Sequence, residues 1–167
     1  MTDLILTRTH LRFGHVRLPC TVGRGGIRGD KRESDGATPV GSHRIVGLLY
    51  RPDRLTAPRP WARPIGICDL WSDDSGDAQY NQLVRAPYLP SHEKLRRADP
   101  LYDIVLLTDW NWPDATPGCG SAIFLHSQRR PGYPTEGCIA FRRDHLLWLV
   151  SRIELGHRLI VPRGLAT

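Results

Sequence analysis

Residues 122–141 read AIFLHSQRRPGYPTEGCIAF, and this stretch decides how the rest of the chain is interpreted. Two apolar runs, Ala122–Leu125 and Ile139–Phe141, flank a polar loop with proline and glycine, which predicts strand, loop and strand. We expect the loop to return the chain antiparallel, so that His126 at the end of the first strand lies beside Cys138 at the start of the second. A thiol beside an imidazole is the minimum equipment of a cysteine acyl-transfer enzyme.

Gly137 stands immediately before this cysteine. It permits a tight backbone in which successive N–H groups point at one spot, as an oxyanion hole requires. The alternative is structural, because a cysteine in an apolar strand is usually a small buried hydrophobe and a single histidine usually serves the fold. On Cys138 and His126 alone, both interpretations stay open.

Phe124–Ser127 and Thr135–Cys138 together resemble the active-site signature of the YkuD-type L,D-transpeptidases, over a region of roughly residues 21–161. The resemblance implies that Cys138 is the nucleophile and His126 the base. It also implies that the backbone carbonyl of Ser127 orients this histidine.

Two features of the signature depart from the family pattern. Glu136 stands where a second histidine is usual, and the spacer between His126 and Cys138 is shorter. The resemblance also implies an oxyanion hole built from the backbone N–H groups of Gly137 and Cys138. A carboxylate at position 136 should raise the pKa of the Cys138 thiol. This holds unless Glu136 points away or pairs with a nearby arginine, for which the candidates are Arg129, Arg130 and Arg142.

Further residues are candidates for binding substrate. Tyr102 and Asn111 flank an apolar strand before the signature, and His92 lies in an insertion, although each could equally serve the fold. Glu136 lies two residues before the signature cysteine. Arg142 would share the face of Cys138 if the strand persists, where it could bind a carboxylate bidentately. For Arg142 the alternative is a solvated charge before a helix.

The composition indicates one mainly β domain. The chain has 167 residues, of which 40% are hydrophobic, with 16 Gly and 14 Pro spread along it, and this suits a single loop-rich globular unit. We therefore predict one catalytic domain over residues 1–167. The resemblance makes it a YkuD-like β-sheet or sandwich with a C-terminal helix and a lid-like insertion at about residues 81–101.

Hydrophobic periodicity predicts the individual elements. Apolar side chains at i, i+3, i+4 and i+7 predict a helix over 146–153, with Asp144 as its N-cap. Ser91 is expected to begin one or two further turns of helix in the insertion. Alternating or apolar runs predict strands at 3–9, 10–13, 16–22, 43–49, 65–71, 102–109 and 158–161.

Cysteine spacing and charge bear on partners. The four cysteines, Cys20, Cys68, Cys119 and Cys138, form no C-x-x-C pair, so we expect no structural metal and no cofactor, while disulfides among the first three stay possible.

The net charge is +6, with 21 Arg and 2 Lys, and nucleic acid is the first partner to consider. The arginines are scattered without a nucleic-acid-binding motif, so we expect no nucleic-acid partner. The charge equally suits a cell-wall polymer that bears peptide carboxylates.

The resemblance implies a reaction, partners and a location. A two-step acyl transfer through a cysteine thioester would cross-link donor and acceptor peptidoglycan stem peptides, with carbapenems as possible inhibitors and a monomer as the working unit. Water or a free D-amino acid as acceptor would give L,D-carboxypeptidase or exchange activity. A non-catalytic cell-wall or polyanion-binding module and a cysteine peptidase or amidase are the other classes. The implied location is the periplasm or cell envelope. No signal peptide is visible in the chain, and no apolar run approaches the length of a membrane span.

Overall fold

The computed structural model describes residues 2–167, and most of its strands belong to one large sheet. The strand order is β11-β12-β13-β3-β2-β1-β14-β6-β7, and β11 also pairs with β6. The nine strands are β1 (Leu4–Leu6), β2 (His10–Phe13), β3 (Val16–Thr21), β6 (Gly41–Tyr50), β7 (Arg63–Pro64), β11 (Ile104–Thr108), β12 (Phe124–Ser127), β13 (Ile139–Phe141) and β14 (Arg158–Val161). The mainly β architecture is confirmed, and the strand expected at 158–161 has the predicted bounds.

The long strand β6 closes the sheet on itself. Its first part, Gly41–Arg44, pairs with β14, and its second part, Ile45–Tyr50, pairs with β11. The register shifts between Leu107 and Thr108, and such a bulge bends the strands locally. Gly47 lies opposite this bend, where a Cβ would approach the Leu107 Cδ1 atom to 2.9 Å. Glycine therefore lets the two strands approach closely where the sheet turns.

The single α-helix among residues 2–167 is α1 (Arg143–Val150), which packs its apolar side chains into the main core. Leu146, Leu149 and Val150 are fully buried, as their helical spacing predicts. The expected N-cap at Asp144 is wrong by two residues, because Arg142 precedes the helix and makes no side-chain cap. Asp144 instead lies in the first turn, where a negative charge suits the helix dipole.

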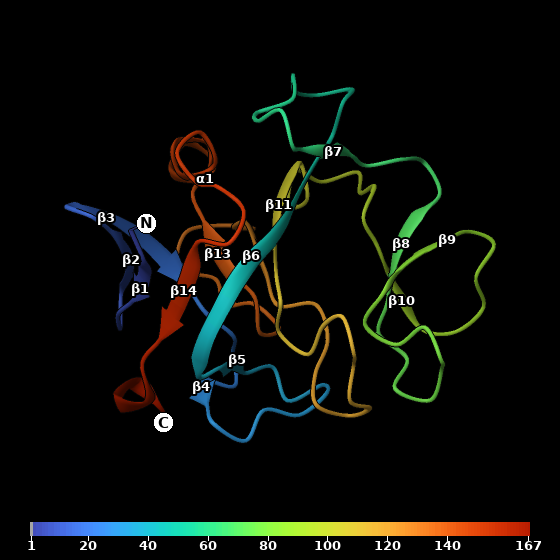
Figure 1. Cartoon of the computed structure of the whole chain (residues 1–167), viewed down its shortest axis with the longest axis horizontal. Coiled ribbons are helices and arrows are strands. Elements are labelled where there is room, and N and C mark those ends of the chain that lie inside the picture. Colours follow the sequence, from blue (N-terminus) through green and yellow to red (C-terminus); the bar gives the residue numbers. More distant parts are fainter. Residues whose placement is uncertain (1) are drawn as a thin grey trace.

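A separate three-stranded sheet carries much of the insertion. Its order is β10 (His92–Lys94), β8 (Asp69–Ser72) and β9 (Leu83–Arg85), and Figure 1 shows it well apart from β1–β3. The helix expected from Ser91 is wrong. Glu93 pairs with Trp71 across the two strands, and this tertiary pairing outweighs the weak local helix signal.

Two short strands and a 3-10 turn complete the chain. β4 (Ile27–Arg28) pairs with β5 (Thr38–Pro39) in parallel, and η1 (Arg163–Leu165) follows the last strand. All four cysteines are free thiols, so the disulfides that the sequence left open are not formed.

Candidate active site

His126 and Cys138 are brought together by the neighbouring strands β12 and β13. These strands are parallel, with His126 opposite Ala140, so the expected antiparallel return is wrong. The connecting loop instead crosses back to the start of the next strand, as parallel pairing requires. Because side chains alternate along a strand, Cys138 and Ala140 lie on the same face as His126. The register therefore places both signature residues on one face of the parallel pair, with Ala140 opposite His126 and Cys138 just before β13.

A cleft of about 810 Å³ lies over this face of the sheet. His126, Cys138 and Ala140 line it, together with side chains from the three-stranded sheet and from the glycine-rich segment at residues 23–41. Ionisable side chains are numerous in the lining, and they are Arg24, Lys31, Glu33, Asp73, His92, Glu93, Lys94, Arg97, Tyr102, Arg129, Tyr133 and Glu136. The cleft thus offers both cationic and anionic groups beside the thiol.

Cys138 is a buried, neutral thiol with two hydrogen bonds. Its Sγ donates to the Ala122 carbonyl over 3.0 Å and accepts from the Phe124 N–H over 3.3 Å. Burial raises the pKa of the thiol to about 12, and the charge of Glu93 adds to this rise. The free protein therefore holds no resting thiolate at neutral pH, and a base must take the proton when the thiol reacts.

His126 has the features of that base. Its Nδ1 lies 2.8 Å from the Ser127 carbonyl, and because a carbonyl only accepts, Nδ1 carries the proton and Nε2 is left basic. Burial lowers the pKa of the ring to about 4, so the imidazole is neutral at working pH. The ring packs nearly perpendicular to that of Tyr102, with the ring centroids 5.3 Å apart.

The turn that precedes Cys138 is fixed by two threonines. Thr135 Oγ1 accepts from the Gly137 N–H over 3.1 Å and donates to the Cys138 carbonyl over 2.5 Å. Thr38 Oγ1 donates to the Gly137 carbonyl over 2.7 Å. Gly137 has φ 137°, and a Cβ there would lie 2.8 Å from the Ala37 carbonyl oxygen. The Gly137 N–H already has a partner, so the expected pair of free oxyanion donors is reduced to the Cys138 N–H.

Glu136 lines the cleft but is engaged by an arginine. It forms two hydrogen bonds with Arg24 Nε, of 2.9 and 2.8 Å, and both side chains are mostly exposed. Its partner is therefore Arg24 and none of the three arginines expected from the sequence. The carboxylate whose charge raises the pKa of Cys138 is Glu93, from the three-stranded sheet.

Two other predicted substrate-binding residues line the cleft. The Tyr102 hydroxyl donates a 2.5 Å hydrogen bond to Glu93 Oε2. His92 also lines the cleft, and its Nδ1 lies 2.8 Å from the Pro90 carbonyl. Both residues stay candidates for contact with substrate.

Asn111 and Arg142 lie outside the cleft lining, so the expectation that they face the site is wrong. Asn111 holds its own loop together, since its side chain bonds the backbone of Thr116 and Gly120. Arg142 lies beyond the end of β13, where it is exposed and pairs bidentately with Asp144. The strand ends before the alternation can direct Arg142 to the face of Cys138.

Sequence reasoning missed Asn81, which supports the backbone around the thiol. Asn81 is buried with φ 58°. Its Oδ1 accepts from the Ala122 N–H and from Trp71 Nε1, and its Nδ2 donates to the Asn111 carbonyl. Ala122 in turn accepts the Cys138 S–H. A single asparagine so far from the signature carries no spacing signal that would reveal this role.

Lys31 was also missed. Its side chain is buried in the cleft and pairs with Asp35 over 2.6 Å. A Cβ at Gly120 would lie 3.2 Å from its Nζ, and its charge lowers the pKa of Cys138 against the larger effect of burial. Lys31 is therefore the cation whose charge lowers the pKa of the Cys138 thiol.

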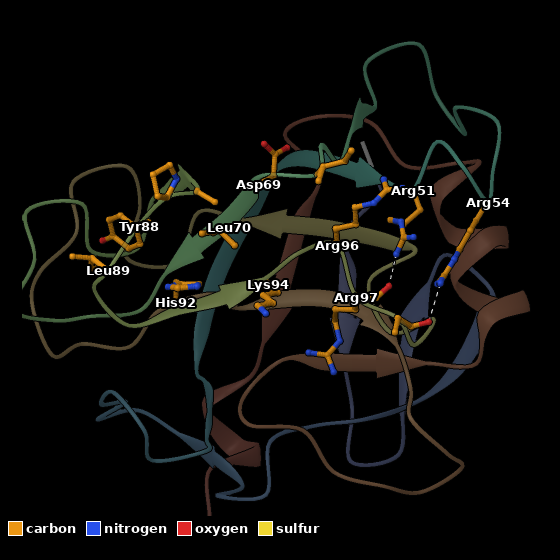
Figure 2. A pocket seen from close by; sticks show the side chains of 14 residues that line it. Arg51, Arg54, Asp69, Leu70, Tyr88, Leu89, His92, Lys94, Arg96 and Arg97 are labelled. Atoms are coloured by element: carbon orange, nitrogen blue, oxygen red, sulfur yellow. Dashed lines mark hydrogen bonds between the residues drawn. The ribbon is translucent and has the colours of Figure 1, made fainter.

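A second cavity of about 690 Å³ adjoins the cleft and shares His92, Lys94 and Arg97 with it. Figure 2 shows Tyr88 and Leu89 at one end and a group of arginines at the other. All four guanidinium groups are already partnered with an aspartate, and they are those of Arg51, Arg54, Arg96 and Arg97. The cavity therefore has less free positive charge than its lining suggests.

Within residues 2–167, no group of three or more His, Cys, Asp and Glu side chains could hold a metal ion. None of the helices formed by these residues has the length and apolarity to cross a membrane.

The fold and site define a mainly β domain with a cysteine and a histidine facing one cleft. Residues 8–161 match the family described as the L,D-transpeptidase catalytic domain, YkuD. The match spans nearly the whole chain, and the chain belongs to this family, which is associated with the cell wall and acts on peptidoglycan. No curated protein matches the chain.

Proposed function

We propose that this protein is an L,D-transpeptidase that forms peptidoglycan cross-links through a thioester on Cys138. The observation that carries the proposal is that His126 and Cys138 line one cleft, on one face of two parallel strands, within a YkuD domain. The other site roles follow from their contacts. Ser127 orients the histidine through its carbonyl, and Gly137 gives the turn the conformation that only glycine adopts readily.

In the first step, His126 Nε2 takes the thiol proton as Sγ attacks the carbonyl of an L-configured centre in the donor stem. The neutral states of both groups in the free protein mean that proton transfer accompanies attack. The Cys138 N–H stabilises the oxyanion. His126 then protonates the amine of the following residue, which leaves, and the donor remains as a thioester.

In the second step, an amine of the acceptor stem attacks the thioester, and Cys138 leaves as a thiol. The product is an amide cross-link. If water attacks instead, the same site is an L,D-carboxypeptidase, and a free D-amino acid gives exchange. All the residues assigned to these steps come from one chain, so a monomer suffices. The function places the protein in the periplasm or cell envelope.

A second candidate is a cell-wall-binding module without thiol chemistry. One observation favours it, which is the burial of Cys138 and the rise of its pKa to about 12, because structural cysteines are typically inert. This candidate predicts peptidoglycan binding that weakens with salt and leaves the peptide unchanged.

The decisive experiment incubates the protein with purified disaccharide-tetrapeptide and determines the masses of the products. A cross-linked dimer supports the transpeptidase, a shortened stem supports the carboxypeptidase, and unchanged material that co-purifies with the protein supports the module.

A further inference from the structure

The second step of the proposed reaction has a requirement that His126 is poorly suited to meet. An acceptor amine is an ammonium ion at neutral pH and must lose a proton before it attacks. Burial holds the pKa of His126 at about 4, which makes it a weak acceptor for that first proton. A second proton-accepting group in the cleft would therefore favour transfer to amines.

Glu93 is placed to be that group. It lines the cleft with Cys138, and its charge acts on the thiol. One carboxylate oxygen accepts the Tyr102 hydroxyl over 2.5 Å, and the ring of the same tyrosine packs nearly perpendicular to that of His126. Within residues 2–167 no side chain or backbone group bonds the other oxygen, Oε1, so it is free to accept from a ligand.

The other glutamates of the cleft are engaged. Glu136 pairs with Arg24, and Glu33 accepts from the Tyr80 hydroxyl and the Ser34 N–H. Glu93 forms no salt bridge within the described chain. Arg97 is the cation whose charge acts most on Glu93. It pairs bidentately with Asp99 and covers the Tyr102 ring at 5.3 Å.

Asp73 adds a second carboxylate to the same part of the cleft. Its Oδ1 is buried without a hydrogen-bond partner in residues 2–167, and its charge raises the pKa of Glu93, although burial is the larger cause. Two carboxylates without a paired cation are costly in a protein interior. An arriving ammonium group would supply the missing positive charge.

We propose that Glu93 receives the acceptor ammonium and takes its first proton, so that the thioester on Cys138 is transferred to amines in preference to water. The inference rests on the proposed two-step function. It adds a residue that selects between the transpeptidase and carboxypeptidase outcomes of that function.

The ammonium gives one proton to the Glu93 carboxylate, and the resulting neutral amine attacks the thioester carbonyl. The C–N bond forms and the C–S bond breaks, while the second proton of the nitrogen passes through His126 to the leaving sulfur. The products are the amide, the Cys138 thiol and a neutral Glu93, which returns its proton to solvent.

The test compares Glu93→Gln with the wild type, using disaccharide-tetrapeptide as donor and acceptor. Acylation is followed by intact-protein mass, and the ratio of cross-linked to hydrolysed product is measured by chromatography. We expect acylation to persist and the ratio to fall about 100-fold, in line with the contribution of a positioned proton acceptor. Asp114→Asn, which removes an exposed charge outside the cleft, should leave the ratio unchanged.

Hydroxylamine separates this role from a structural one. It is largely uncharged at neutral pH and needs no proton acceptor before attack. It should therefore release the acyl group from Glu93→Gln at the wild-type rate. A variant that was merely distorted would react slowly with both nucleophiles, and that result would overturn the proposal, as would an unchanged product ratio.

Tyr102→Phe keeps the test valid if Glu93→Gln does not fold. It removes only the hydroxyl that holds Glu93, and we expect a smaller fall in the ratio, about tenfold, again with normal release by hydroxylamine. An unchanged ratio in this variant would also count against the role of Glu93. Failure of the wild type to form any acyl-enzyme would instead refute the proposed function itself.

Discussion

The Thr38 hydroxyl donates a 2.7 Å hydrogen bond to the Gly137 carbonyl, across 99 positions of sequence, and accepts from the Gly23 N–H. This buried group joins the glycine-rich segment to the turn that presents Cys138. The structure makes Thr38 a support of the proposed nucleophile.

Thr38→Ala should therefore weaken both the fold and the reaction. Loss of the hydroxyl leaves a buried donor and a buried acceptor without partners, at about 1–3 kcal/mol for such a group. We expect a lower free energy of unfolding in urea and slower acylation of Cys138 by a donor stem peptide. Thr56→Ala, at an exposed position, is the control. Equal stability of the two variants would contradict the role assigned to Thr38.

Gly137→Ala should be more damaging than its size suggests. The new Cβ would lie 2.8 Å from the Ala37 carbonyl oxygen, at a φ of 137° that other residues rarely adopt. Such strain costs about 1–3 kcal/mol, and we expect a lower melting temperature together with loss of acylation. Gly164→Ala, where no atom lies within 4 Å, should behave as the wild type. Wild-type acylation by Gly137→Ala would show that the turn is less constrained than described.

Burial of a neutral His126 should make the fold sensitive to acid. Its pKa is about 4 in the folded protein and 6.5 in the reference state, so the unfolded chain binds more protons between these values. Stability should fall as the pH drops from 6.5 towards 4, by roughly 3 kcal/mol at most from this residue. Urea unfolding at several pH values measures the effect. His126→Gln should flatten this part of the profile, and an unchanged profile would show that His126 is not buried as a neutral ring.

The two glutamates should affect the thiol differently. Alkylation of Cys138 by iodoacetamide should rise with pH up to at least pH 10 without a plateau, because burial raises its pKa to about 12. Glu93→Gln should speed alkylation, since it removes a charge that opposes the thiolate. Glu136→Gln should not, because that carboxylate is exposed and pairs with Arg24. Faster alkylation in Glu136→Gln than in Glu93→Gln, or a plateau of the rate below pH 8, would contradict the assigned geometry.

Local sequence patterns predicted most of the elements. The alternation in the first 22 residues gave three strands that the structure contains, and the apolar face of α1 is buried as expected. The direction of β13 was not predictable, because a loop rich in glycine and proline fits either a hairpin or a crossover. The strand at His92–Lys94 depends on pairing with β8, which no local propensity encodes.

The candidate site was predictable where it is contiguous. Cys138, His126 and Gly137 could be proposed from the sequence because they lie within one short motif, whereas Glu93, Asn81 and Lys31 come from distant segments with no fixed spacing. Arg142 was misplaced because the alternation argument assumed a longer strand than the one that ends at Phe141.

The central claim is that Cys138 carries the donor acyl group, and intact-protein mass spectrometry tests it most directly. Wild-type protein mixed with disaccharide-tetrapeptide or a carbapenem should gain the mass of the acyl group, and peptide mapping should place it on Cys138. Cys138→Ala should gain no mass, and His126→Ala should gain it at least about 100-fold more slowly. An adduct of the same mass on Cys138→Ala would contradict the account.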